Sequence, residues 1–125
     1  MQEHPNATRA REMTAAMSRG EWQKLDDYIA DDVVWHEIGS TEPRRGKEAL
    51  RAVMAGAGEP FEITYETHDV VANDDHTIVI GEATATRGGR TLTYRTAEIF
   101  HMRDGKVTER WAFSDDTAAI IDFFA

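Results

Sequence analysis

The chain has 125 residues, of which 41% are hydrophobic and 30% are charged, a composition typical of one folded globular domain. Its 23 acidic residues outnumber its 14 lysines and arginines, and the net charge of −9 disfavours binding to nucleic acid or anionic membranes, because like charges repel. No cysteine is present, which excludes disulfides, zinc–thiolate sites and cysteine nucleophiles. Because no segment has the pattern of a signal peptide or a membrane span, we expect a cytoplasmic protein.

Two helices are predicted near the N-terminus from the spacing of apolar residues. Met13 and Met17 share one apolar face at helical spacing, and Asn6 or Thr8 is placed to cap the start of this first helix. A second, shorter helix is predicted over residues 22–29.

A strand and a third helix are predicted next. The acidic pair at 31–32 is expected to end the second helix, and residues 33–38 are β-branched and aromatic, which is typical of a strand. Residues 39–46 form a turn-rich loop, and residues 46–54 return to helical spacing. The apolar side of this third helix consists of Leu50, Val53 and Met54.

Four strands and a closing helix are predicted for the rest of the chain. The strands cover residues 61–71, 76–87, 90–102 and 107–113, and the helix covers residues 118–124. Gly88-Gly89 and Asp104-Gly105 predict tight hairpins, and strands joined by hairpins are antiparallel. The order predicts an α+β fold in which helices pack on one face of a curved antiparallel sheet.

Three segments carry a resemblance to a known superfamily: Ala30–His36, Gly39–Gly46 and Phe100–Trp111. In this order and at these distances they resemble the nuclear transport factor 2-like superfamily, and within it the SnoaL-like and ketosteroid isomerase-like proteins. The resemblance covers nearly the whole chain. It implies a single domain over residues 1–125, a cone-shaped α+β barrel in which a curved sheet wraps around the N-terminal helices and leaves an apolar pocket.

The resemblance also implies several chemistries. Members of the superfamily include isomerases, polyketide cyclases, epoxide hydrolases and binding proteins without catalytic activity. Ketosteroid isomerases use a carboxylate base, and a tyrosine and a protonated acid hold the oxyanion. When this sequence is compared with such an isomerase, Glu37 stands at the position of the base and Glu98 at the position of the protonated acid. The tyrosine position falls near Met13, which has no hydroxyl, and Tyr65 or Tyr94 remains as a replacement donor.

Alternation along the strands supports both acids as pocket residues. Trp35 and Glu37 share one face of the first strand, so that Glu37 is expected beside a large aromatic wall. On the long strand, Glu98 shares a face with Phe100 and Met102. An acid among apolar neighbours tends to stay neutral, and a neutral acid can donate a hydrogen bond to a developing oxyanion.

The alternative for each acid is a structural ion pair or a solvated position. The candidate partners are Arg44 and Arg45 for Glu37, and Arg95 and Arg110 for Glu98. Both alternatives leave the acids without a role in chemistry.

The residues predicted to bind substrate are mostly apolar or aromatic: Met13, Met17, Trp35, His36, Val53, Met54, Phe100 and Met102. Strict alternation turns His36 away from Glu37, and the alternative for this histidine is a hydrogen-bonded place under a helix or at a subunit contact. The five histidines show no metal-ligand spacing, so we expect no metal and no cofactor.

These observations predict a protein that binds a hydrophobic small molecule, with an isomerase or cyclase acting by proton transfer on a ketone-bearing substrate as the first hypothesis. The alternatives are a small-molecule binding protein without catalysis, an epoxide hydrolase-like relative, and a protein-interaction module. By resemblance we expect a homodimer that pairs through the exposed face of the sheet, and no nucleic-acid or membrane partner. The residues expected on that face are Thr91, Thr93, Arg95, Ala97 and Ile99.

Overall fold

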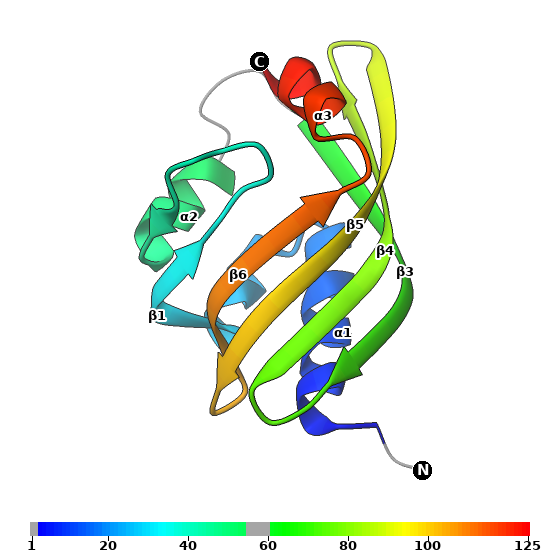
Figure 1. Cartoon of the computed structure of the whole chain (residues 1–125). Coiled ribbons are helices and arrows are strands. Elements are labelled where there is room, and N and C mark those ends of the chain that lie inside the picture. Colours follow the sequence, from blue (N-terminus) through cyan, green and yellow to red (C-terminus); the bar gives the residue numbers. More distant parts are fainter. Residues whose placement is uncertain (1–2, 55–60) are drawn as a thin grey trace.

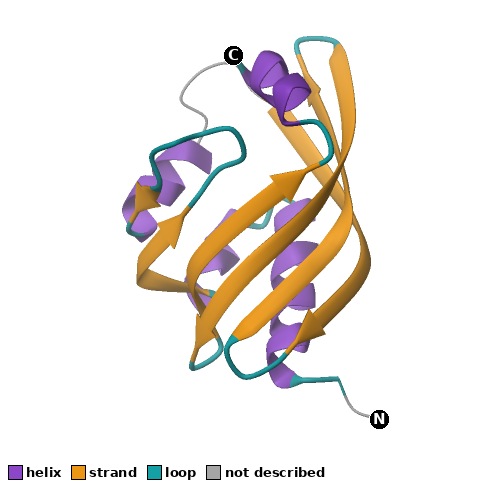
Figure 2. Cartoon of the chain, in the orientation of Figure 1, coloured by secondary structure: helices purple, strands orange, loops and turns teal. Residues whose placement is uncertain are grey.

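The computed structural model describes the backbone of residues 3–54 and 61–125, and the side chains of these residues except Val53 and Met54. Figure 1 shows the chain and Figure 2 its secondary structure. In chain order the elements are α1 (Pro5–Ser18), the 3-10 helix η1 (Trp22–Asp27), β1 (Ile29–Trp35), β2 (Arg44–Arg45), α2 (Lys47–Met54), β3 (Phe61–Ala72), β4 (His76–Arg87), β5 (Arg90–Arg103), β6 (Lys106–Ser114) and α3 (Thr117–Phe124).

The strands form a six-stranded sheet with the order β2-β1-β6-β5-β4-β3. Neighbouring strands are antiparallel, except that β1 and β6 run parallel. The sheet curves around α1, and its two edges, β2 and β3, do not pair with each other (Figures 1 and 2). The predicted α+β fold with a curved sheet around the N-terminal helix is therefore confirmed, whereas the sheet is open and does not close into a barrel.

The four long strands β3 to β6 agree closely with the prediction, because their turns are encoded locally. Gly88 and Gly89 connect β4 to β5 at φ values of 57° and 78°. Asp104 and Gly105 connect β5 to β6 at 54° and 76°. Consecutive left-handed residues give the backbone the twist that a two-residue hairpin needs, so these pairs fix where the strands reverse.

The first strand starts earlier than predicted because it pairs with a distant segment. β1 begins at Ile29, so the acidic pair at 31–32 lies inside the strand and does not end a helix. Ile29 is in register with Val107 of β6, and the backbone N–H of Val107 donates to the carbonyl of Tyr28 at 2.7 Å. The helix predicted over residues 22–29 would have paired these backbone groups locally, whereas in the structure they form hydrogen bonds with β6.

The first strand also ends earlier than predicted. The two-residue strand β2, Arg44–Arg45, pairs with Val34 and Trp35 and was too short to be recognised from its pattern. Beyond Trp35 the chain leaves the strand, so His36 and Glu37 lie in the loop that leads to β2. Strict strand alternation therefore does not govern these two side chains.

The start of α1 differs from the prediction as well. The cap is His4, whose ring nitrogen Nδ1 accepts a hydrogen bond from the backbone N–H of Asn6 at 3.1 Å. Pro5 follows at the first helical position, where its missing N–H costs nothing. Asn6 and Thr8, the predicted caps, lie inside the helix.

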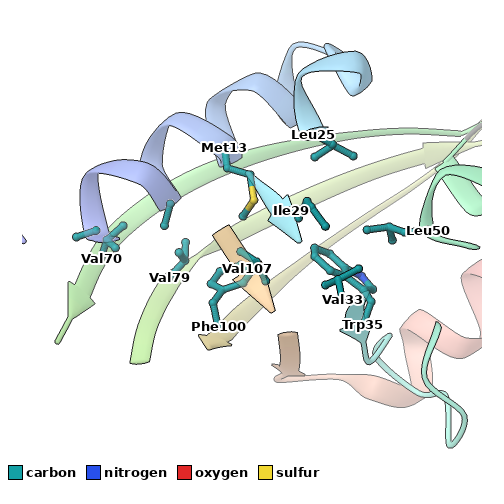
Figure 3. Packing of buried hydrophobic residues seen from close by; sticks show 12 residues of the cluster. Met13, Leu25, Ile29, Val33, Trp35, Leu50, Val70, Val79, Phe100 and Val107 are labelled. Atoms are coloured by element: carbon teal, nitrogen blue, oxygen red, sulfur yellow. The ribbon is translucent and has the colours of Figure 1, made fainter. Parts of the chain in front are cut away.

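The main core lies between α1 and the concave face of the sheet. Figure 3 shows its larger members: Met13, Leu25, Ile29, Val33, Trp35, Leu50, Val70, Val79, Phe100 and Val107. A second cluster lies under α3 and contains Ala83, Ala85, Tyr94, Ile120 and Phe123. No helix among residues 3–54 and 61–125 is long and apolar enough to cross a membrane.

Candidate functional site

A large cavity lies where the two hydrophobic clusters meet. Its volume is about 840 Å³, within the range of roughly 300–1,000 Å³ that is usual for small-molecule sites. Helices and strands both contribute to its apolar wall, which includes Met13, Met17, Trp35, Leu50, Phe100 and Ile120. The curved sheet and α1 thus enclose space for a multi-ring ligand.

The structure brings half of the predicted binding residues to this cavity, namely Met13, Met17, Trp35 and Phe100. Met102 instead packs against the main core, and its sulfur accepts a hydrogen bond from the Thr77 hydroxyl at 3.4 Å. The pairing of β5 with β6 shifts between His101 and Met102, and this irregularity ends the alternation on which the prediction for Met102 rested. The side chains of Val53 and Met54 lie outside the described residues.

His36 lies beside β6, away from the large cavity. Its ring stacks on Trp111 with centroids 5.3 Å apart and planes 5° apart. Its Nε2 atom lies 2.9 Å from a carboxylate oxygen of Glu109. His36 is therefore hydrogen-bonded outside the large cavity, and it lines a smaller pocket beside β6.

Glu98 lines the cavity from β5 and pairs with Arg110 of β6. The Nε and Nη2 atoms of Arg110 both lie 3.1 Å from Oε2 of Glu98, and the two side chains are only 13% and 16% exposed. The guanidinium also lies 4.6 Å from the ring centroid of Trp35. A carboxylate that faces a guanidinium accepts hydrogen bonds, so this contact does not support the predicted role of Glu98 as a neutral donor.

Glu37 lines the same cavity from the loop after β1. Its Oε1 atom accepts a hydrogen bond from Nε of Arg44 at 3.3 Å, and the Glu37 side chain is 33% exposed. Arg110 donates from Nη1 to the carbonyl of His36 at 2.9 Å, directly before Glu37 in the chain. One guanidinium therefore contacts both Glu98 and the backbone next to Glu37. Each acid is both a cavity residue and half of an ion pair.

Hydroxyl groups form a second polar feature of the cavity wall. The hydroxyl of Tyr65 on β3 lies 2.8 Å from Oγ1 of Thr96 on β5. Burial raises the pKa of Tyr65 to about 12, while the hydrogen bond from Thr96 acts in the opposite direction. Ser18 of α1 accepts a hydrogen bond from the backbone N–H of Tyr65 at 3.1 Å. These contacts fix the ring of Tyr65 against the cavity.

Three arginines of the cavity were not predicted as site residues: Arg44, Arg87 and Arg110. Sequence reasoning treats arginines as surface residues, because a buried guanidinium needs partners that a sequence does not show. The sequence did indicate a place for Arg110, because the hairpin at Asp104-Gly105 sets this residue opposite Phe100. Residues directly opposite each other in a hairpin share one face of the sheet, here the face toward the pocket. In the described part of the chain, no cluster of three or more acidic or histidine side chains is placed to hold a metal ion.

Known proteins with the same fold have different chemistries. Bal32a, from a soil-derived mobile gene cassette, is 25% identical, with a TM-score of 0.84 and 97% of each chain covered. IdmH, a candidate polyketide cyclase from Streptomyces antibioticus, is 22% identical, with a TM-score of 0.73 and coverage of 98% of this chain and 100% of that chain. An LEH-like epoxide hydrolase from M. tuberculosis is 15% identical, with a TM-score of 0.80 and coverage of 96% and 86%.

The family assignment rests on the sequence as well as the fold. None of the curated proteins matches the chain significantly. The family model of the SnoaL-like domain matches residues 10–110, a segment that runs from α1 to Arg110 in the cavity wall. A shared fold does not fix a shared reaction. The chain belongs to the SnoaL-like domain family, within the nuclear transport factor 2-like superfamily.

Proposed function

We propose that this protein binds a hydrophobic, ketone-bearing small molecule in the cavity and transfers a proton on it, as an isomerase or a cyclase does. The observation that carries the proposal is the presence of the Glu37 carboxylate on the wall of a mostly apolar cavity of about 840 Å³. An apolar wall excludes water from a bound substrate and strengthens electrostatic effects on the reacting atoms.

Glu37 is the proposed base. Only its Oε1 atom is hydrogen-bonded to a described residue, Arg44, so Oε2 is left to accept a proton. The base takes a proton from the carbon next to the ketone, and the electrons of the broken C–H bond form an enolate. Return of the proton to a different carbon completes an isomerisation. In a cyclisation, the enolate carbon instead attacks a second carbonyl and closes a ring, and the alkoxide that forms takes the proton back from Glu37. Glu98 is proposed to act with Arg110, which balances its charge beside the developing enolate.

The proposal is tested by isomerisation of a β,γ-unsaturated ketosteroid, followed by the absorbance of the conjugated ketone that forms. We expect wild-type turnover, and a decrease in kcat of about 10²- to 10⁴-fold for Glu37→Gln, because the amide cannot accept the proton. The matched control is Glu82→Gln, an exposed glutamate on β4 outside the cavity, which is expected to leave kcat unchanged. Equal rates for the wild type and Glu37→Gln would show that Glu37 is not the base.

Binding without catalysis is the second candidate, because the cavity and its apolar wall serve a carrier equally well. If the wild type shows no turnover but a saturated ketosteroid raises its melting temperature, the binding function is supported and the catalytic one is rejected. An epoxide hydrolase-like reaction is the third, because Glu98 and Arg110 supply a carboxylate and a cation at one place. Hydrolysis of cyclohexene oxide by the wild type but not by Glu98→Gln would favour it.

A further inference from the structure

The wall of the large cavity carries more positive than negative charge, although the protein as a whole is acidic. Among the described residues that line it, Arg44, Arg87 and Arg110 are cations, whereas Glu37 and Glu98 are anions. Three positive against two negative charges give this wall a net charge of +1, in a chain whose net charge is −9. The excess on the wall bears on the charge of the ligand.

Two of the three arginines are engaged by the protein itself. Arg110 contacts Glu98 through Nε and Nη2, both at 3.1 Å, and donates from Nη1 to the carbonyl of His36 at 2.9 Å. All three of its nitrogens therefore have partners. Arg87 donates from Nη1 to the carbonyl of Phe123 at 3.0 Å and holds the end of α3. Both guanidinium groups are thus tied to parts of the fold.

Arg44 is bound through one nitrogen only. Its Nε atom donates to Glu37 at 3.3 Å, and no described residue accepts a hydrogen bond from its two Nη atoms. Arg44 is in register with Trp35, which also lines the cavity, and its side chain is 48% exposed. The planar guanidinium can hold a carboxylate by two parallel hydrogen bonds from its Nη edge, which is the edge formed by Nη1 and Nη2. That edge remains available where the cavity meets solvent.

Other donors of the wall are uncharged. Thr14, Trp22, Trp35 and Tyr94 line the cavity with a hydroxyl or an indole N–H, and they suit the ketone oxygen of a ligand. They do not balance the charge of a carboxylate, which is costly to bring into an apolar site without a cation. Exposed acids elsewhere on the protein act weakly here, because charges are screened beyond about 8 Å at physiological ionic strength.

We propose that the Nη edge of Arg44 binds the carboxylate of an amphipathic ligand, so that the cavity takes hydrophobic keto acids. This assignment rests on the proposed small-molecule function and deepens it, since it names the substrate class and orients the ligand. The rings lie against the apolar wall, and the acid group stays partly hydrated beside Arg44. Because Arg44 also contacts Glu37, a carboxylate held here brings the neighbouring carbons beside the proposed base.

The test compares two probes that share their rings and ketone and differ in charge, 4-oxo-4-(2-phenanthryl)butanoate and its primary amide. Isothermal titration calorimetry near neutral pH gives both dissociation constants for the wild type, Arg44→Gln, Arg44→Lys and Arg87→Gln. The matched control is Arg45→Gln, since Arg45 is the next residue of β2, is also exposed and is not among the residues that line the cavity. Each protein is first checked for a cooperative thermal unfolding transition.

We expect the wild type to bind the carboxylate about 3- to 10-fold more tightly than the amide, because a half-exposed charged contact lies between a surface ion pair and a buried one. Arg44→Gln should remove this preference and leave binding of the amide unchanged. Arg44→Lys should keep part of it, because the charge remains while the two parallel hydrogen bonds are lost. Arg45→Gln should keep the wild-type ratio of the two constants.

Three results would overturn the assignment. Equal binding of the two probes by the wild type would do so and leave the small-molecule function standing. A preference that is lost in Arg87→Gln and retained in Arg44→Gln would transfer the carboxylate to Arg87. Failure of both probes to bind the wild type would overturn the small-molecule function together with this assignment.

A double variant separates a direct contact from an indirect effect. Loss of Arg44 also leaves Glu37 without its partner, and the freed negative charge by itself repels a carboxylate. The Arg44→Gln exchange is therefore repeated in the Glu37→Gln protein, where this charge is absent. We expect carboxylate binding to weaken there by a similar factor. An unchanged constant in that background would show that Arg44 acts only through Glu37 and would overturn the assignment.

Discussion

Gly81 is the residue that allows Tyr65 to reach Thr96. Tyr65 lies on β3, Thr96 lies on β5, and Gly81 on the intervening β4 is in register with Thr96. A Cβ atom at position 81 would lie 2.7 Å from two carbons of the Tyr65 ring, and it would also crowd the carbonyl oxygen of Glu66. The ring can cross β4 because this position has no side chain. The hydrogen bond on the cavity wall therefore depends on one glycine.

We expect Gly81→Ala to lower the free energy of unfolding by about 1–3 kcal/mol, as overpacking of a filled site usually does. The substitution should also displace the Tyr65 ring from Thr96. Urea unfolding measures the first effect, and the phenolic ¹³C signal of Tyr65 measures the second. Glu82→Ala, the next residue along β4 and exposed, is the control. A wild-type urea midpoint for Gly81→Ala would contradict the steric argument.

The eight-residue helix α3 closes one end of the cavity, and its two ends are held by different means. At its start, a carboxylate oxygen of Asp116 accepts a hydrogen bond from the backbone N–H of Ala119 at 3.0 Å. At its end, Arg87 and Arg90 each donate to the carbonyl of Phe123 at 3.0 Å. Cations at a helix C-terminus also interact favourably with its dipole. So short a helix needs these contacts, because it is marginal in isolation.

Loss of the N-cap should therefore weaken α3. We expect Asp116→Ala to lower the free energy of unfolding by about 0.5–2 kcal/mol, and Asp116→Asn to restore most of it, because asparagine caps a helix almost as well as aspartate. Thermal and urea unfolding of the three proteins give the comparison. If the alanine and asparagine variants were equally stable, the capping bond would not be what holds this end of the helix.

The outer face of the sheet carries an exposed apolar surface, on the side opposite to α1. Val71, Ile80 and Phe113 are 48%, 40% and 59% exposed, and Ile99 and Trp111 lie between them on the same face. Apolar surfaces of this kind mark interaction sites more often than free surface. We therefore propose that a second copy of the chain covers this face, which is the homodimer expected from the family resemblance.

Light scattering coupled to size-exclusion chromatography tests this proposal. We expect a mass twice that of the 14.1-kDa chain, and a shift toward the single-chain mass for Ile80→Glu, because the variant would bury an unpaired charge in the proposed contact. Ala15→Glu adds the same charge to the exposed surface of α1 and should leave the mass unchanged. A single-chain mass for the wild type would reject the dimer.

Much of the fold follows from local sequence. The pairs Gly88-Gly89 and Asp104-Gly105 fix two hairpins, and alternation along β5 correctly turns Glu98 and Phe100 toward the cavity. The start of β1 was not predictable in this way, because Ile29 owes its strand conformation to parallel pairing with Val107 far along the chain. Local propensity is overridden where a distant strand supplies the hydrogen bonds.

By itself, the sequence determined the α+β class, the positions of the two hairpins and the face of β5 that carries Glu98, because these depend on turn chemistry and side-chain periodicity. Glu37 was placed by the family resemblance, because it lies in a loop where strand alternation does not apply. Only the tertiary structure decided how these acids are paired. Arg110 contacts Glu98 across a hairpin, and it also contacts the backbone of His36 in the loop after β1. Partners of buried polar groups are set by which segments the folded chain brings together, and no local pattern encodes that choice.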